Sequence, residues 1–90
     1  MIMTAEQRKT IEEQFYNYKA SNEQWRSVFD SVLIRYKWKS EEALLRKKYI
    51  EHKNHKRICK EIGISKRTYS YWQNRILEDA YMFAKELKLL

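Results

Sequence analysis

The chain has 90 residues, with 19 Lys and Arg against 12 Asp and Glu, which gives a net charge of +7. This length fits one domain over residues 1–90 with a single core, and it leaves no space for a large substrate pocket beside that core. One cysteine excludes an internal disulfide framework and favours a reducing compartment, and no apolar run is long enough for a membrane span or a signal peptide. We therefore expect a cytoplasmic protein with no membrane partner.

The N-terminal part, residues 1–40, predicts a pair of helices. The first covers about residues 5–19 and has an apolar face made of Ile11, Phe15 and Tyr18. Ser21 or Asn22 can cap the second helix. Its apolar side chains fall at i, i+3, i+4, i+7, i+8 and i+11, which is a full stripe over three turns: Trp25, Val28, Phe29, Val32, Leu33 and Tyr36.

Ser40 is the predicted N-cap of a third helix. Glu41 and Glu42 would then lie in its first turn, where the helix dipole favours acids. This helix would bury Leu44, Leu45 and Tyr49 and expose Arg46, Lys47 and Lys48. After a loop, a fourth helix is expected over about 54–62. Ser65 can cap a fifth helix that continues to about residue 88, with apolar positions at Tyr69, Trp72, Ile76, Ala80, Phe83, Leu87 and Leu90.

No segment alternates in the manner of a strand, so we predict an all-α fold of about five helices with a long last helix. Residues 41–90 are expected to hold the last three helices. Gly63, the only glycine in a chain without proline, separates the last two helices and can adopt the positive φ of a tight turn. Together these features predict a C-terminal helix-turn-helix. Its expected core and turn residues are Ile58, Cys59, Ile62, Gly63, Ile64, Tyr69, Trp72 and Ile76.

The positive charge is concentrated around this motif. Residues 46–75 hold ten Lys or Arg against two acids, a surplus of eight, so the remaining 60 residues carry a net charge of −1. A partner rich in phosphates would favour such a segment, because each neutralised phosphate releases counterions. The alternative is a solvated basic face that keeps the protein soluble.

With the apolar side chains of the fifth helix turned inward, its exposed arc would hold Lys66, Arg67, Ser70, Tyr71 and Asn74. These residue types can contact base edges in a major groove: Arg pairs with guanine and Asn with adenine. Four further cations flank the motif as expected phosphate contacts: Lys56, Arg57, Lys60 and Arg75. Double-stranded DNA is thus the predicted partner, and residues 41–90 are the expected DNA-binding part.

Other patterns are weaker. His52, His55 and Cys59 lack a fourth ligand for a structural zinc, so we expect neither a metal nor any other cofactor. The chain has no catalytic triad, phosphate-binding glycine loop or paired carboxylates, which argues against an enzyme and against a small-molecule substrate. A second set of aromatic residues favours core packing over a stacking platform for single strands: Tyr16, Tyr18, Trp38 and Tyr49.

Two roles stay open for the apolar residues at the C-terminal end, plain core or the seam of a homodimer formed through the last helix. These residues are Met82, Phe83, Leu87, Leu89 and Leu90.

Two segments of the chain resemble a known family. The stretch TIEEQFYNYKASNEQWRSVFDSVLIRY is similar to the opening of small activators of late-gene transcription in phages of Gram-positive bacteria, the RinA and ArpU type. The stretch YIEHKNHKRICKEIGISKRTYSYWQNRILEDAYMFAKEL resembles their C-terminal helix-turn-helix, which is itself similar to region 4 of sigma factors. The resemblance implies activation of phage late genes in a bacterial host cell, with RNA polymerase as a further partner.

Two other functions compete with a sequence-specific transcriptional regulator. A phage small terminase subunit recognises the packaging site on DNA and assembles into a ring, but its helix-turn-helix usually lies at the N-terminus. A helical adaptor would bind proteins, and its basic face would then be incidental.

Overall fold

Residues 3–90, which the computed structural model describes, fold into five α-helices without a strand. The elements in chain order are α1 (Ala5–Tyr16), η1 (Tyr18–Ala20), α2 (Glu23–Arg35), α3 (Ser40–Leu45), η2 (Arg46–Ile50), α4 (His55–Ile62) and α5 (Lys66–Glu86). Here η1 is a 3₁₀ turn and η2 is a turn of π-helix. The predicted all-α class, with a C-terminal helix-turn-helix and a long last helix, is confirmed. Met1 and Ile2, part of the predicted 1–90 domain, lie outside the described residues.

Polar side chains start four of the five helices. Asn22 Oδ1 accepts a hydrogen bond from the Trp25 amide at 2.9 Å, as predicted for the start of α2. Equivalent caps at the starts of α1, α4 and α5 are made by Thr4, Asn54 and Ser65. α3 begins differently, because Ser40 already lies inside the helix and Lys39 occupies the N-cap without a side-chain bond. The predicted Ser40 cap is therefore wrong by one residue.

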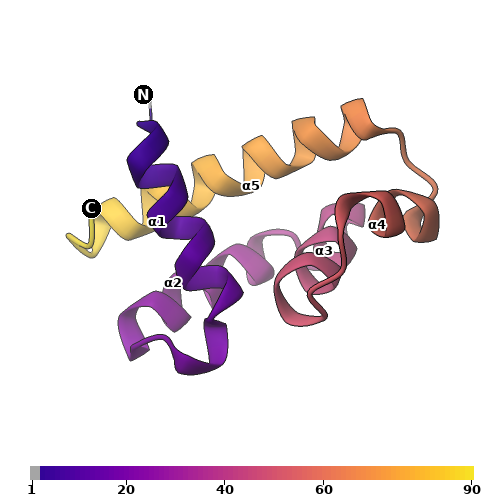
Figure 1. Ribbon diagram of the computed structural model, residues 1–90. Helices are drawn as coiled ribbons and strands as arrows, with labels where there is room; N and C mark the ends of the chain where they lie inside the picture. The colour runs from indigo at the N-terminus through magenta and orange to yellow at the C-terminus, as the bar shows by residue number, and fades with distance from the viewer. Residues whose placement is uncertain (1–2) are drawn as a thin grey trace.

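α5 is the element against which the other helices pack. It extends along the top of the molecule, where α1 crosses its C-terminal half and α3 and α4 lie beneath its N-terminal half (Figure 1). At 21 residues it is about 31 Å long. Its C-terminal half is thus part of the domain, since it packs on α1 and α2.

Phe15 of α1 is fully buried and joins two other elements in the core. The Phe15 ring meets Phe29 of α2 at 4.9 Å and Tyr49 of η2 at 5.4 Å between centroids, both edge to face. Such pairs add to the free energy that burial of the rings already provides. The predicted stripe of α2 is confirmed, with Leu33 as its one half-buried member.

The buried face of α5 differs from the predicted one. Its buried residues are Tyr69, Gln73, Ile76, Leu77, Ala80, Tyr81 and Ala84. Trp72, Phe83 and Leu90 are half-buried, and Leu87 is exposed. The face is rotated because α5 lies across α1 on one side and α2 and α3 on the other, an arrangement that apolar spacing within α5 does not encode.

Three further expectations are corrected. α1 ends at Tyr16 and not near residue 19, because the chain passes into the 3₁₀ turn η1 after Asn17, whose side-chain amide also donates to the Glu13 carbonyl. Lys48 is buried and not exposed, since the wider π-helical turn of η2 brings Lys48 and Tyr49 inward together. Trp38, expected in the core, is 89% exposed.

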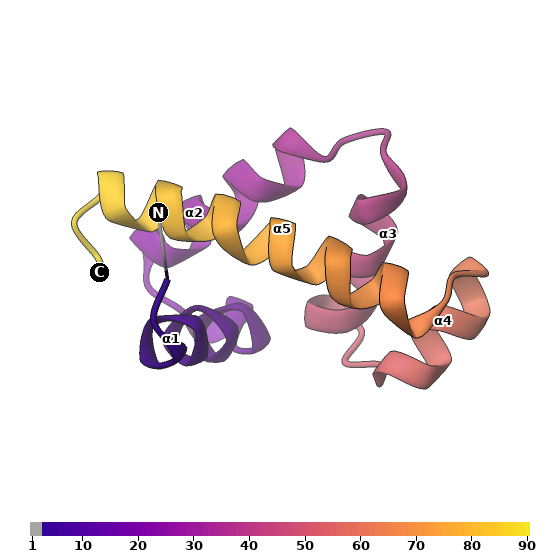
Figure 2. The same cartoon turned by 90° about the horizontal axis from the view of Figure 1, so that it is seen from above.

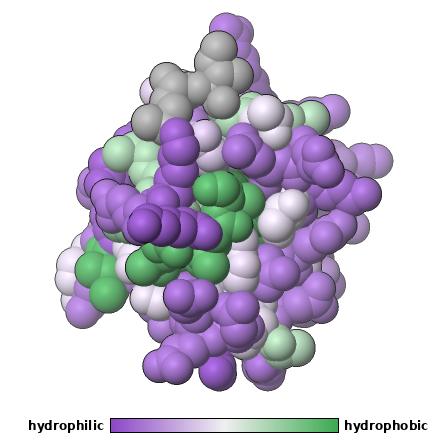
Figure 3. Space-filling model, turned by 90° about the vertical axis from the view of Figure 1, so that its left-hand side faces the viewer, coloured by the Kyte–Doolittle hydropathy of each residue, from purple (hydrophilic) through white to green (hydrophobic). Residues whose placement is uncertain are grey.

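Apolar side chains also gather at the end of the molecule that holds both termini. A space-filling view of this end shows an apolar area within a largely hydrophilic surface (Figure 3). Met82 and Leu87 are exposed on α5 and its C-cap, whereas Leu89 and Leu90 pack against the core. A homodimer through this helix stays a prediction. Across residues 3–90, no helix combines the length and the apolar character that crossing a membrane requires.

We expect Phe15→Ala to lower the free energy of unfolding by about 3–5 kcal/mol, because it removes a fully buried ring and leaves a cavity beside two others. Tyr71→Ala, at a position 60% exposed on α5, is the matched control and should change it by less than about 0.5 kcal/mol. Urea denaturation of both variants measures this difference. Equal losses would place Tyr71 in the core.

Candidate nucleic-acid interface

The turn between α4 and α5 is built around Gly63, which has φ 78° and ψ 39°. The amides of Gly63 and Ile64 both donate to the Cys59 carbonyl, at 2.8 and 3.0 Å, and so close the end of α4. The Cys59 thiol lies 3.8 Å from the Ser65 carbonyl and donates to it across the turn. Ser65 Oγ then accepts from the Thr68 amide at 3.1 Å and starts α5. Three residues, 63–65, thus connect the two helices.

The predicted core of the motif divides into two groups. Ile58, Tyr69 and Ile76 are buried. Cys59, Ile62, Ile64 and Trp72 are half-buried and pack against the core from its edge. The prediction that α4 buries Cys59 and Ile62 with Ile58 is thus confirmed only for Ile58, because Cys59 and Ile62 lie at the edge of the core and are half-buried.

All five predicted base-reading residues are exposed on α5: Lys66, Arg67, Ser70, Tyr71 and Asn74. Seen from above, α5 lies in front of the helices it packs on, so one side of it is left uncovered (Figure 2). Residues 66–75 would span about 15 Å, comparable with the roughly 12 Å width of a major groove. Exposed Glu78 comes one turn later, and its carboxylate would repel phosphates there.

Arg8 of α1 joins this arc from a distant part of the chain. Its Nη1 donates to Oδ1 of Asn74 at 2.7 Å. A guanidinium is thereby held beside a residue expected to contact bases, so Arg8 belongs to the candidate interface. The two residues lie 66 positions apart, and no local pattern in the sequence links them.

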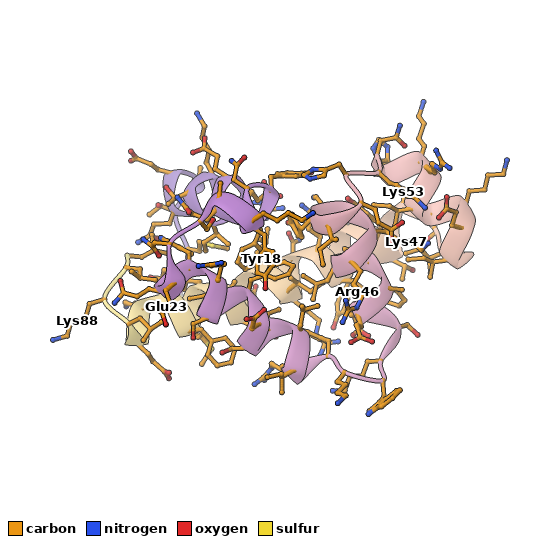
Figure 4. All side chains as sticks on the ribbon, turned by 90° about the horizontal axis from the view of Figure 1, so that it is seen from below. Tyr18, Glu23, Arg46, Lys47, Lys53 and Lys88 are labelled. Carbon is orange, nitrogen blue, oxygen red and sulfur yellow. The ribbon has the colours of Figure 1, made fainter. Side chains whose placement is uncertain are left out.

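Glu61 of α4 gathers three cations at the edge of the motif. Its Oε1 lies 2.7 Å from Lys47 Nζ and 2.8 Å from Lys53 Nζ, and its Oε2 lies 2.9 Å from Arg57 Nε. Lys47 and Lys53 converge next to α4 (Figure 4). Hydrogen bonds from Lys47, Lys53 and Arg57 hold the pKa of Glu61 well below its usual range. Arg57, a predicted phosphate contact, therefore already has an acidic partner.

Arg75, also predicted to contact phosphate, is paired as well. Its Nη1 lies 3.3 Å from Glu41 Oε2 on α3, and its guanidinium lies 5.8 Å from the Tyr71 ring. Its side chain is still 46% exposed. Four other cations of the motif have no ion pair with any residue of the described part of the chain: Lys56, Lys60, Lys66 and Arg67.

A polar hollow of about 400 Å³ opens beside the start of α5. It is lined by Tyr16, Lys48, Lys53, Asn54, His55, Lys66, Tyr69, Ser70 and Gln73. Lys48 and Lys53 in this lining pair with Glu12 and Glu61, whereas Lys66 has no ion pair within residues 3–90. Lys66 is therefore the cation that would favour a backbone phosphate at the mouth of the hollow, next to the predicted base-reading arc.

A buried cluster around Glu12 of α1 supports the floor of this hollow. Glu12 Oε1 accepts from Gln73 Nε2 at 2.8 Å, and from Lys48 Nζ and Tyr49 Oη at 3.3 Å each. Lys48 also lies over the rings of Tyr49 and Tyr69, at 5.3 and 5.5 Å. Burial lowers the pKa of Lys48, and Glu12 opposes that shift. Gln73 is buried on α5 because this cluster satisfies its amide.

The histidines take part in aromatic contacts. His52 stacks on Tyr16 at 5.9 Å, and His55 lies 6.1 Å from the Tyr69 ring. Over residues 3–90, no three His, Cys, Asp or Glu side chains gather into a group that could hold a metal ion. Of the proposed stacking residues, Tyr49 is buried, Tyr18 is half-buried and Tyr16 is 39% exposed, so core packing describes them only in part.

Comparisons of the chain with protein-family models, with curated proteins and with solved structures find no match. The chemistry of the interface therefore rests on the residues described above.

We expect Gly63→Ala to lower the free energy of unfolding by about 1–2 kcal/mol, because a Cβ disfavours this left-handed backbone. No atom lies within 4 Å of the added Cβ, so strain and not a clash is the cause. Gly63→Asn is the matched control and should cost less, since Asn tolerates this conformation. Thermal unfolding of both variants measures the two losses, and equal losses would show that strain in the left-handed backbone is not the cause.

Because the Tyr69 side chain is buried, we expect it to cause a loss of stability at alkaline pH. Burial raises its pKa from 10.0 to about 12. The raised pKa contributes stability that is fully present below pH 10 and is lost as the pH rises through 12, because the unfolded chain ionises first. Relative to Tyr69→Phe, the wild type should lose about 1–2 kcal/mol over this interval. Denaturation at a series of pH values measures the difference, and parallel curves would contradict the shift.

Proposed function

We propose that this protein binds double-stranded DNA through α4 and α5. The observation that carries the proposal is the distribution of unpaired cations. Between residues 46 and 75, six cations are engaged by carboxylates, and the four that remain, Lys56, Lys60, Lys66 and Arg67, lie on the two helices of the motif. Within this most basic segment of the chain, the cations without a carboxylate partner are thus those on α4 and the start of α5, where a phosphate backbone would need them.

In this proposal the 66–74 arc of α5 enters the major groove. Arg67 can donate two hydrogen bonds to guanine, and Asn74, held by Arg8, can pair with adenine. Lys56 and Lys60 on α4 would contact the phosphate backbone at the edge of the groove. The polar hollow next to Lys66 would accommodate the adjoining phosphate.

We further propose that DNA binding serves regulation of transcription. This step is supported by the resemblance to late-gene activators, which also implies contact with RNA polymerase. Packaging-site recognition is the alternative among DNA-binding functions. Size-exclusion chromatography with light scattering separates the two, because a small terminase forms a high-order ring, whereas a monomer or a dimer fits the regulator.

Affinity for random duplex DNA should fall steeply as salt is raised, and each lost phosphate contact should reduce the slope of log K against log salt by about 0.9. We expect this reduction for Lys60→Gln and for Lys66→Gln. Lys88→Gln is the matched control, since Lys88 lies at the opposite end of the molecule from Lys53 and α4 (Figure 4). Fluorescence anisotropy measures the slopes. Salt-independent or absent binding would overturn the proposal and favour the protein-binding adaptor.

Arg67→Ala should cost about 1–3 kcal/mol of binding free energy on the specific site and little on random sequence, if Arg67 contacts a base. Genomic footprinting supplies the site, and its place relative to a promoter or a packaging origin shows which process it serves. Competition binding then compares the two sequences. An equal loss on both would make Arg67 a phosphate contact.

A further inference from the structure

Trp38 is the most exposed large apolar side chain in the described part of the chain, at 89%. It lies in the turn between α2 and α3, far along the sequence from the helix-turn-helix. Its φ is 68°, in the left-handed region that a bulky side chain rarely adopts. A fold normally tolerates such a conformation where the surroundings or a function require it.

The turn holds Trp38 outward by backbone hydrogen bonds on both sides. The Lys37 amide donates to Ile34 O at 3.2 Å, and the Lys39 amide donates to Tyr36 O at 2.9 Å. The Lys37 ammonium lies 5.4 Å from the Trp38 ring centre. Within the domain the Trp38 ring makes one cation–π contact and is almost entirely exposed. These contacts do not explain why a tryptophan occupies a position whose backbone conformation suits glycine.

Further apolar surface adjoins this turn. Ile34, on the last turn of α2, is 72% exposed. Beside it lies a hollow of about 390 Å³ between α2 and α3, lined by Asp30, Leu33, Ile34, Lys37, Glu42 and Arg46. Lys37 connects the two features, since it lines the hollow and lies over the indole. We name the surface formed by Leu33, Ile34, Lys37, Trp38 and Lys39 the α2–α3 patch.

The charges around the patch indicate what it would bind. Glu42 pairs with Arg46 at 3.7 Å, whereas Asp30 accepts a hydrogen bond from the neutral Tyr18 Oη at 2.8 Å and has no cation partner within residues 3–90. Lys37 and Lys39 have no carboxylate partner in the same residues, so these two ammonium groups outnumber the one unpaired carboxylate. Two unpaired ammonium groups beside an exposed indole and an isoleucine complement a partner that is both acidic and apolar.

We propose that the α2–α3 patch docks an acidic segment of another protein that carries apolar side chains, with Trp38 as the central anchor. Trp is among the residues that contribute most to protein interfaces, and flanking lysines would steer an acidic partner. The connection between α2 and α3 protrudes beyond the edge of α5 when the molecule is seen from above (Figure 2). The patch is therefore separate from the uncovered side of α5, and the proposal does not depend on DNA binding.

The test follows the three indole N–H signals of the full chain by NMR while a short synthetic peptide of alternating Glu and Leu or Phe is added. We expect the Trp38 signal to shift. Affinity should fall about tenfold or more in Trp38→Ala and in Lys37→Glu/Lys39→Glu. A peptide with Lys in place of Glu is the matched control and should not bind. Unchanged affinity in both variants, or no binding, would overturn the proposal.

Two further arms exclude other partners. Vesicles of phosphatidylglycerol and phosphatidylcholine should leave the Trp38 signal in place, and so should duplex DNA. If the peptide does not bind and one of these two shifts the signal, the patch belongs to that partner instead.

Trp38→Gly should keep or raise the melting temperature, because glycine suits the backbone. A clear drop would show that the indole supports the fold, and would overturn the docking role.

Discussion

The arrangement of this domain depends on carboxylates that must find donors on a neighbouring helix. Glu12 on α1 binds Gln73 on α5, and Glu41 on α3 pairs with Arg75 on α5. Asp79 on α5 accepts from Tyr36 Oη and pairs with Arg35, the C-cap and the last residue of α2. Glu61 ties α4 to η2 and the following loop. A half-buried carboxylate without such donors would be costly, so these contacts fix how the helix-turn-helix lies on the N-terminal helices.

The same pairing decides where positive charge stays available. Lys48 is surrounded by Glu12 and tyrosine rings, and Glu61 engages three further cations at the edge of α4. Net charge along the sequence overstates the charge that can act on a partner, because an ion-paired lysine attracts phosphate more weakly than a free one. The proposal of DNA binding therefore rests on the cations that remain, and on their place along α4 and the first turns of α5.

The two proposed surfaces belong to different elements and have different chemistry. The arc on α5 is polar and cationic with a single exposed aromatic residue, Tyr71, and would suit the edges of bases and a phosphate backbone. The α2–α3 patch has an exposed indole and an isoleucine edged by lysines, and would suit an acidic protein segment. Because α2 packs directly on α5 and so connects the two surfaces, a protein using both could hold a partner at a set position relative to DNA.

By itself the sequence determined the helix content, most helix starts and the turn. Local causes produce these features: Asn22, Asn54 and Ser65 cap the next helix through their own side chains, and Gly63 alone has no Cβ to oppose a positive φ. The exposure of the 66–74 arc also followed, since the i, i+3 and i+7 spacing of Tyr69, Trp72 and Ile76 indicates one side of α5 well enough to place the other side in solvent.

Only the tertiary structure decided which polar residues are buried and which cations are free. Lys48 and Gln73 are buried because Glu12, distant in the sequence, supplies the acceptor for both, and Arg8 reaches Asn74 across 66 positions. Trp38 is exposed because the turn after α2 directs it away from the core, although its residue type favours burial. Pairing between helices and the direction of a turn depend on how the elements meet, and periodicity within one element carries no information about that.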